Sequence, residues 1–394
     1  MQLTVVILNY NVKFFIDICL QSVLAATIDL DAEVILVDNA SVDGSTAWIS
    51  KQFPQVKQVN NQKNVGFAMG NNIGVSQAKG TYLCILNPDT IVAEDTFTKA
   101  ISFMDNNKEV AIMGPKLIDG SGTFLKESKR GIPTPAVAFS KVSGLYKIAP
   151  KLFGKYYNMR LPKDKSGPTE ILVGAFMFMR TEHYFELNGF DEACFMYSDD
   201  IDLSYRSLQL GKQNYYNADI TVIHFKGEST PKDFAYQLMF REAMNYFYNK
   251  HFHVSRLVKV WIKLATNIFS YLKRMRGTHS IIKKKQPYCY WLVSDELDLK
   301  IGVNKNVLFM HTSVMEDVLE HINRQTEIIF DPDTISFAEM IAFINEHKGA
   351  FSYKFLSSDK SHAVGSTSSN AKGEVVVMSV SYTHLTLPTK PKVG

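Results

Sequence analysis

The sequence predicts an α/β protein whose first domain is built on a mostly parallel, Rossmann-like sheet with flanking helices. Residues 3–8 and 32–40 are apolar runs rich in β-branched side chains, as expected for strands buried on both faces. Stretches with helical spacing follow these runs, over 13–26 and 45–53. Strand and helix patterns that alternate in this way are typical of parallel strands joined by right-handed crossovers.

The alternation continues along the chain. We expect, in order, a weak strand at 56–61, a helix at 66–80 closed by Gly80, a strand at 81–89, an irregular excursion at 115–168, a strand at 170–179 followed by a short helix and a glycine turn, a strand pair at 214–225 and an aromatic-rich helix at 233–253.

A chain of 394 residues favours more than one domain. We expect the first α/β domain over 1–250 and a basic helical segment over 251–285. Short strand patterns separated by helical stretches predict a small second α/β domain over 286–380, of unknown role. Residues 381–394 break the pattern and resemble a translated sequencing adapter, so we expect a non-native tail there.

The basic segment has an amphipathic pattern. Residues 256–276 place apolar side chains on one helical stripe and carry six Lys and Arg residues with no acid. This pattern predicts a helix that lies on a membrane surface, and the alternative is a helix packed on the domain with a solvated basic face. The sequence predicts no transmembrane helix and no secretory signal peptide, which favours a cytoplasmic protein.

Composition excludes several classes of protein. The chain is 46% hydrophobic and 21% charged, as in globular proteins, and its net charge of +4 is too small to indicate nucleic-acid binding. The four cysteines are too far apart for a zinc site or a disulfide framework and are expected to be reduced core residues. A GxGxxG motif after the first strand would indicate a Rossmann oxidoreductase, but that segment contains no glycine.

Polar residues follow three of the predicted parallel strands. Ligands of such sheets bind outside the carboxyl ends of the strands, so these residues predict a binding site. One such group would be explained by the turn preference of Asn and Asp, but three on the same sheet edge favour a site. The groups are Asn9, Tyr10 and Asn11; Asp38 and Asn39; and Asn87 and Asp89.

The segment "SDDIDLSYR" places three carboxylates within four residues. Ser198, Asp199 and Asp200 suit the start of a helix, where acidic residues interact favourably with the helix dipole. Asp202 and Arg206 are four residues apart and are expected to form a structural pair. Crowded carboxylates also raise one another's pKa, as expected of a catalytic base.

Seven motifs together resemble glycosyltransferase family 2, in its rhamnosyltransferase-like bacterial group, over about residues 3–230. They are "VVILNYN", "VDNASVDGS", "NVGFAMGNNIG", "LNPDT", "GAFMFMR", "GFDEACFMYSDDIDLSYR" and "IHF". The resemblance implies a GT-A fold that binds a nucleotide-diphospho-sugar, and a sugar transfer that inverts the anomeric carbon.

The resemblance also implies roles for individual residues. Asn87 and Asp89 occupy the family's metal-binding DXD position, with Asn in place of the first acid, and His224 completes the site for Mg²⁺ or Mn²⁺. Asp200 matches the catalytic base, and Asp199 stands where Glu is commoner. The expected nucleotide-binding residues are Asn9, Tyr10, Asp38, Asn64, Gly66, Asn72 and Gly174, with Asn87 beside the diphosphate.

The function expected from these residues is transfer of a sugar to a glycan acceptor, in the synthesis of a bacterial surface polysaccharide. A lipid-linked acceptor fits the basic segment, and the enzyme would then act at the inner face of the plasma membrane. The alternative is a catalytically inactive protein that binds a nucleotide sugar or a glycan. Asp89, Asp200 and His224 together argue against it, because binding alone needs no base.

Overall fold

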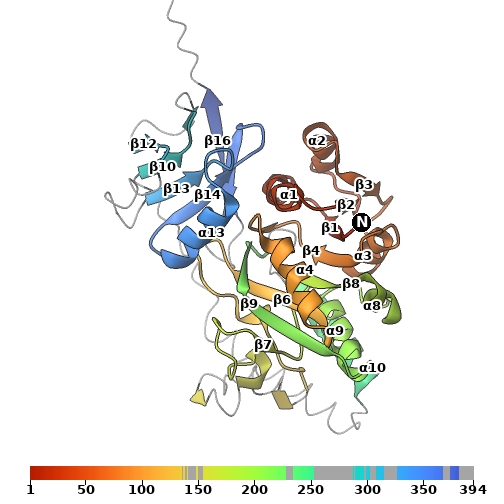
Figure 1. The fold of residues 1–394 in the computed structure, drawn as a ribbon. Coiled ribbons are helices and arrows are strands. Elements are labelled where there is room, and N and C mark those ends of the chain that lie inside the picture. Colours follow the sequence, from red (N-terminus) through yellow and green to blue (C-terminus); the bar gives the residue numbers. More distant parts are fainter. Residues whose placement is uncertain are drawn as a thin grey trace, which may run out of the picture.

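A computed structural model contains two β-sheets, one from each half of the chain (Figure 1). It describes residues 1–134, 136–137, 140, 148–149, 154–227, 234–252, 287, 289–296, 299–301, 308–314, 326–366 and 373–380. The predicted tail at 381–394 and nearly all of the basic segment, including 256–276, lie outside the described residues.

The first sheet has nine strands, and its N-terminal half is parallel. The order β3-β2-β1-β4 confirms the predicted alternation of strands and helices, since the three pairs among these four strands are all parallel. Every residue of β1 and β4 is buried, as expected for central strands. The strands are β1 (Leu3–Asn9), β2 (Ala32–Asp38), β3 (Lys57–Asn60) and β4 (Tyr82–Leu86).

The other half of this sheet is mixed, and it differs from the prediction in two places. Strand β8 (Phe176–Arg180) is shorter than the predicted 170–179, because the backbone before it turns towards Asp200. The predicted strand pair at 214–225 is the single strand β9 (Gln213–His224). Between Asn217 and Thr221 the strand has a register shift against β6 (Val110–Ile118), and its pairing continues on both sides of the shift. The short strands β5 (Thr90–Ile91) and β7 (Gly167–Pro168) pair with β9.

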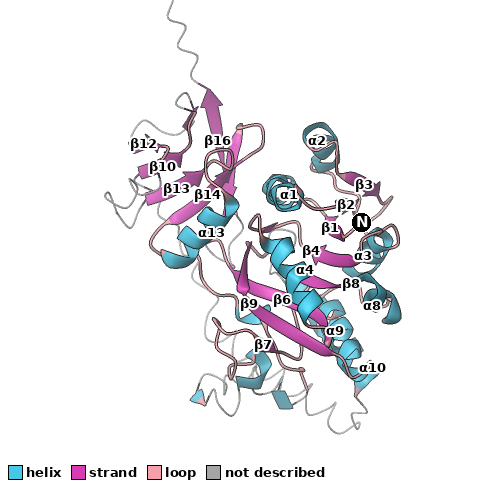
Figure 2. Ribbon diagram, in the orientation of Figure 1, coloured by secondary structure: helices cyan, strands magenta, loops and turns pink. Residues whose placement is uncertain are grey.

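Helices cover both faces of this sheet (Figure 2). One face packs on α1 (Lys13–Thr27), α2 (Ser45–Gln52) and α4 (Thr96–Asn106). The opposite face packs on α3 (Phe67–Val75), α8 (Thr181–Glu186) and α9 (Asp199–Gln209), and α10 (Phe234–His251) packs beside α9. Two 3₁₀ turns, η1 (Lys126–Ser128) and η2 (Gly154–Tyr157), lie in the irregular excursion.

The predicted end of the third helix is wrong. Helix α3 ends at Val75, and Gly80 comes just before β4 instead of closing the helix. A Cβ atom on Gly80 would lie 2.4 Å from the carbonyl carbon of Leu3. The glycine is therefore required by close packing of two backbones and not by a helix cap.

The second sheet has seven strands in the order β11-β16-β15-β14-β13-β10-β12. Strands β12, β10, β13 and β14 are parallel, and the remaining pairs are antiparallel. Helix α13 (Phe337–Glu346) begins with a capping box between Ser336 and Glu339. The strands are β10 (Cys289–Val293), β11 (Leu299–Ile301), β12 (Leu308–Thr312), β13 (Thr326–Phe330), β14 (Ser352–Leu356), β15 (His362–Gly365) and β16 (Glu374–Val380).

The two sheets share one hydrophobic core. Phe15 and Phe225 from the first half pack with Phe355 from the second, at ring-centroid distances of 5.0 and 5.9 Å from Phe225. Polar contacts add to this interface, because Glu94 accepts hydrogen bonds from the first two backbone amides of α13. The second sheet therefore packs directly against β5 and β9 of the first sheet.

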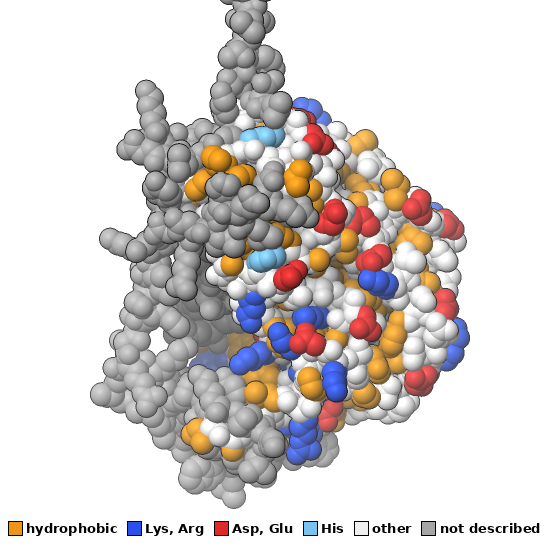
Figure 3. Space-filling view, turned by 60° about the vertical axis from the view of Figure 1, so that its left-hand side comes forward, with side chains coloured by type: hydrophobic (Ala, Val, Ile, Leu, Met, Phe, Trp, Pro, Cys, Tyr) orange, Lys and Arg blue, Asp and Glu red, His pale blue; other side chains and the backbone are white. Residues whose placement is uncertain are grey.

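The surface carries both signs of charge. Figure 3 shows Lys and Arg side chains gathered towards the lower part of the described surface, with Asp and Glu dispersed over the rest. Within the described ranges, no helix combines the length and the apolar character needed to cross a bilayer. All four cysteines are buried and unpaired, as predicted.

Candidate active site

A cavity of about 350 Å³ lies at the carboxyl ends of the parallel strands. Its walls bring together nine of the residues predicted from the sequence, which come from six separate segments of the chain. These residues are Tyr10, Asn64, Gly66, Asn87, Asp89, Gly174, Asp199, Asp200 and His224.

Asp89 and His224 form one end of the cavity. Pairing of β5 with β9 places His224 opposite Thr90, so the imidazole Nε2 lies 3.3 Å from Asp89 Oδ1. Asn87 Nδ2 lies 3.4 Å from the same nitrogen. Asp89 and His224 are buried, yet Asp89 Oδ1 and His224 Nδ1 have no hydrogen-bond partner in the described part of the chain.

This donor set fits a divalent cation that shares its ligands with a substrate. A carboxylate, an imidazole and an amide are suitable ligands, and buried polar atoms without partners need such an explanation. Among the described residues, no group of three or more His, Cys, Asp or Glu side chains is arranged to hold a metal alone. A cation bound here would therefore need further oxygen ligands from the substrate.

Asp199 and Asp200 open helix α9 at another wall of the cavity. Asp200 Oδ2 accepts hydrogen bonds from Arg130 Nη2 at 2.6 Å and from the backbone amide of Gly174 at 3.0 Å. Asp199 accepts only the backbone amide of Asp200, at 3.1 Å, among the residues described. Burial raises the pKa of Asp199 to about 7, and the negative charge of Asp200 adds to the shift.

Arg130 is a charged residue of the cavity that the sequence analysis missed. It lies in the irregular excursion, where no periodic pattern marks it, and the only signal is a basic stretch around it. Burial alone would lower the pKa of Arg130, but the neighbouring Asp200 carboxylate outweighs burial and the pKa is raised. The Arg130 guanidinium therefore stays positively charged beside Asp200.

Two amides and a glycine also line the cavity and are bonded to one another. Asn39 Nδ2 donates to Asn64 Oδ1 and to the Gly66 carbonyl, and Asn64 Oδ1 also accepts the Gly66 amide. Gly66 has φ +87°, and a Cβ atom there would lie 2.7 Å from the Phe195 carbonyl oxygen. Only glycine fits this position without displacing the chain.

Three residues predicted to bind the nucleotide do not line this cavity. Asn9 is fully buried and donates to Asp38 Oδ1 at 2.7 Å, while Asp38 Oδ2 accepts the amide of Ser41. Asn72 donates to the Phe190 carbonyl and accepts from Tyr184, so it anchors the loop after α8. These side chains hold the loops around the cavity, and their contact with a nucleotide stays a prediction.

Asp202 and Arg206 are structural, as expected. Arg206 Nε donates to Asp202 Oδ2 at 2.6 Å, and the other carboxylate oxygen of Asp202 meets Lys250 and His251 of helix α10. The pair therefore joins α9 to α10, away from the lining of the cavity.

Comparison with known proteins identifies the family. Residues 4–185 match the model of the family described as "Glycosyl transferase family 2". The matched residues 4–185, in the first domain, belong to glycosyltransferase family 2. The chain is a glycosyltransferase, and its α/β architecture, a large partly parallel sheet flanked by helices, is the one predicted from the sequence.

Relatives of this glycosyltransferase include two rhamnosyltransferases. The N-acetylglucosaminyl-diphospho-decaprenol L-rhamnosyltransferase of Mycobacterium tuberculosis is 23% identical over 257 residues, which cover 62% of this chain and 83% of the relative. Rhamnosyltransferase WbbL of Escherichia coli is 26% identical over 171 residues, covering 41% of this chain and 61% of WbbL.

Similar solved structures include a mannosyltransferase of Pyrobaculum calidifontis, PcManGT, which was solved with GDP-Man and Mn²⁺. It is 16% identical, with a TM-score of 0.44 over 71% of this chain and 76% of the other.

Proposed function

We propose that this glycosyltransferase transfers a sugar, with inversion, from a nucleotide-diphospho-sugar to a glycan acceptor. The observation that carries the proposal is the arrangement of one cavity, which has Asp89 and His224 at one end and Asp199 and Asp200 on another wall. The first pair suits a diphosphate with its cation, and the second suits an acceptor hydroxyl.

Asp200 is the proposed base. It takes the proton of the acceptor hydroxyl while that oxygen bonds to the anomeric carbon. The bond from the anomeric carbon to the diphosphate oxygen breaks in the same step, and the nucleoside diphosphate leaves with the bonding electrons. One displacement inverts the carbon, so a single base suffices and no covalent intermediate is needed.

Asp89 and His224 would hold Mg²⁺ or Mn²⁺, with Asn87 beside them and the donor diphosphate supplying the remaining ligands. When bound, the cation would neutralise the charge that develops on the leaving diphosphate. His224 would bind the cation through Nε2, the nitrogen that lies 3.3 Å from Asp89 Oδ1.

The wall of Tyr10, Asn39, Asn64 and Gly66 is proposed to receive the nucleoside. Its amides offer both donors and acceptors, and Tyr10 offers an aromatic surface. Asn9 and Asp38 support this wall from beneath through their mutual hydrogen bond.

We further propose a lipid-linked glycan as the acceptor and dTDP-rhamnose or a UDP-sugar as the donor. The Mycobacterium relative is named for a diphospho-decaprenol acceptor, which supports a lipid-linked substrate. The basic residues 256–276, which lie outside the described residues, would bring the enzyme to the inner face of the plasma membrane.

The test is nucleoside diphosphate release from a panel of nucleotide sugars, with lipid-linked acceptors and with Mn²⁺, Mg²⁺ or EDTA. We expect turnover with one donor, loss of turnover in EDTA, and a fall in kcat of roughly 10²- to 10⁴-fold in Asp200→Asn. The exposed Asp29→Asn is the control and should keep wild-type turnover. Binding of a nucleotide sugar without transfer to any acceptor would support an inactive binding protein instead.

A further inference from the structure

The backbone of Arg130 is held in place by hydrogen bonds that do not involve its side chain. Arg130 and Ile171 form an isolated antiparallel bridge and exchange two backbone hydrogen bonds of 2.9 Å. Thr169 Oγ1 donates to the Arg130 carbonyl at 3.2 Å. The segment that carries Arg130 is therefore fixed to the segment that leads into Gly174.

The guanidinium of Arg130 is fixed as well. Nη2 donates to the Leu172 carbonyl at 2.7 Å and to Asp200 Oδ2 at 2.6 Å. Gly174 donates its amide to the same carboxylate oxygen at 3.0 Å. Within the described part of the chain, no donor binds Asp200 Oδ1, so that oxygen is left to accept a proton.

We propose that Arg130 is a positioning residue for the catalytic base: it fixes Asp200 through Oδ2 and thereby presents Oδ1 to the acceptor hydroxyl. This inference rests on the proposed function, since it concerns the group that Asp200 would deprotonate. It adds a residue from the irregular excursion to the transfer machinery. Positioning of this kind matters because a displacement of about 1 Å can cost about 100-fold in rate.

The place of the pair argues against a role in folding alone. Arg130 and Asp200 both line the cavity, although each is at least nine-tenths buried. A buried ion pair is a weak source of stability, because the cost of desolvating the two charges offsets their attraction. A pair placed on the wall of an active site is better explained by its effect on the carboxylate.

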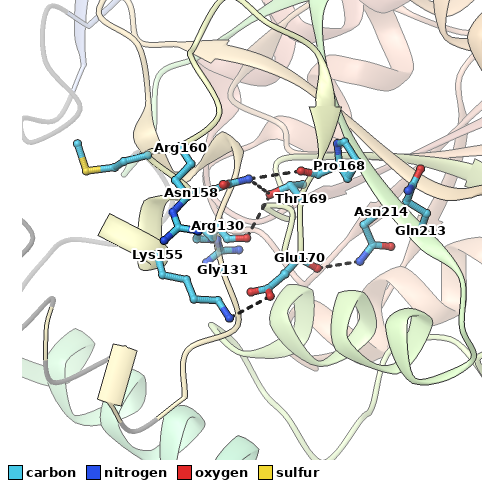
Figure 4. Close-up of a pocket in the computed structure, with 11 residues that line it drawn as sticks. Arg130, Gly131, Lys155, Asn158, Arg160, Pro168, Thr169, Glu170, Gln213 and Asn214 are labelled. Atoms are coloured by element: carbon cyan, nitrogen blue, oxygen red, sulfur yellow. Dashed lines mark hydrogen bonds and ion pairs between the residues drawn. The ribbon is translucent and has the colours of Figure 1, made fainter. Parts of the chain in front are cut away.

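A second cavity reaches Arg130 from another side and makes the proposal testable. It has a volume of about 480 Å³ and is also lined by Lys155, Asn158, Glu170 and Asn214 (Figure 4). Removal of the Arg130 side chain would leave an empty space that opens into this cavity. A small planar cation such as guanidinium could then enter and occupy the position of the missing group.

The experiment compares Arg130→Ala and Arg130→Lys with the exposed control Lys126→Ala, using the donor and acceptor that wild type turns over. For Arg130→Ala we expect kcat to fall by about 100-fold with the donor KM within about twofold. Millimolar guanidinium should restore a measurable part of kcat, Arg130→Lys should lose less, and Lys126→Ala should behave as wild type. The thermal midpoint of each variant is measured in parallel.

A chemical readout separates this inference from the proposed function. Carbodiimide modification of Asp200, located by mass spectrometry, requires a protonated carboxyl and no turnover. Arg130→Ala should increase this modification several-fold near neutral pH. Unchanged kcat and unchanged modification would overturn the role of Arg130, and so would a loss of kcat that neither guanidinium nor Lys relieves. If the wild-type enzyme transfers no sugar, the proposed function is refuted. The modification of Asp200 would still show whether Arg130 controls that carboxylate.

Discussion

His224 Nε2 lies 3.3 Å from Asp89 Oδ1, across the pairing of β9 with β5. The two side chains are far apart in the sequence: Asp89 comes directly before β5, and His224 is the last residue of β9. Ile91 of β5 and Ile223 of β9 are fully buried in the core that both sheets share. The geometry at this end of the cavity therefore depends on packing as well as on the two side chains.

Removal of either side chain should weaken metal dependence. We expect His224→Ala to raise the Mn²⁺ concentration that gives half-maximal turnover by about 10- to 100-fold, because the cation loses a nitrogen ligand. Asp89→Asn should have a larger effect, because it removes the charged carboxylate that lies beside His224. Mn²⁺ titrations of activity and calorimetry with nucleoside diphosphate would measure both. His311→Ala, at a half-buried position on strand β12 of the second sheet, is the control, and equal Mn²⁺ dependence in all three variants would contradict the assignment.

The stability of the fold should depend on pH through Asp199. Its ordinary pKa is 3.8, and in the folded protein burial raises the pKa to about 7. The folded state therefore favours the protonated form, so this contribution is complete below about pH 4 and is lost as pH rises through 7. Asp199→Asn should raise the thermal midpoint at pH 8 and leave it nearly unchanged at pH 4. A midpoint that rises equally at both pH values would contradict the shift.

The second sheet should influence the end of the cavity formed by Asp89 and His224. Phe355→Ala removes a buried ring that contacts Phe225, the residue after His224, and should cost about 3–5 kcal/mol of unfolding free energy. It should also increase the Mn²⁺ requirement, because the end of β9 loses its support. Phe351→Ala is the matched control, since this buried ring contacts Phe343, His347 and Tyr353 within the second domain.

Denaturant unfolding and Mn²⁺ titration would be measured on both phenylalanine variants. We expect both to be destabilised and only Phe355→Ala to need more Mn²⁺. If the two variants require the same Mn²⁺ concentration as wild type, the second sheet has no influence on the site beyond stability.

Gly66 should be essential for the shape of the amide wall. Gly66→Ala places a methyl group 2.7 Å from the Phe195 carbonyl oxygen and from its ring, at a residue with φ +87°. We expect the donor KM to rise at least tenfold, because Asn64 and Asn39 are bonded to this residue. Gly211→Ala is the control: it has φ +74° but open space around it, so it should cost about 1 kcal/mol and leave KM unchanged. Equal donor KM values in the two variants would show that Phe195 moves away from the added methyl group without changing the donor site.

The sequence determined the parallel half of the first sheet, the short-strand character of the second, and nine of the residues that line the cavity. Apolar β-branched runs must be buried whatever their surroundings, and motif residues at strand ends are brought to one edge by the parallel order of β1, β2 and β4. Local pattern failed at β9, where Asn217 to Asp219 look like a turn but lie at a register shift inside one strand.

Only the tertiary structure decided which polar residues meet. Asn9 and Asp38 stand at strand ends as clearly as Tyr10 does, yet their hydrogen bond to each other places them outside the lining of the cavity. Arg130 has no periodic pattern, and its role depends on a backbone bridge to Ile171 and on a carboxylate 70 residues further along the chain. Sequence patterns report which side chains must be buried, because burial follows from local periodicity. They do not report long-range partners, because a hydrogen bond depends on positions that the whole fold fixes.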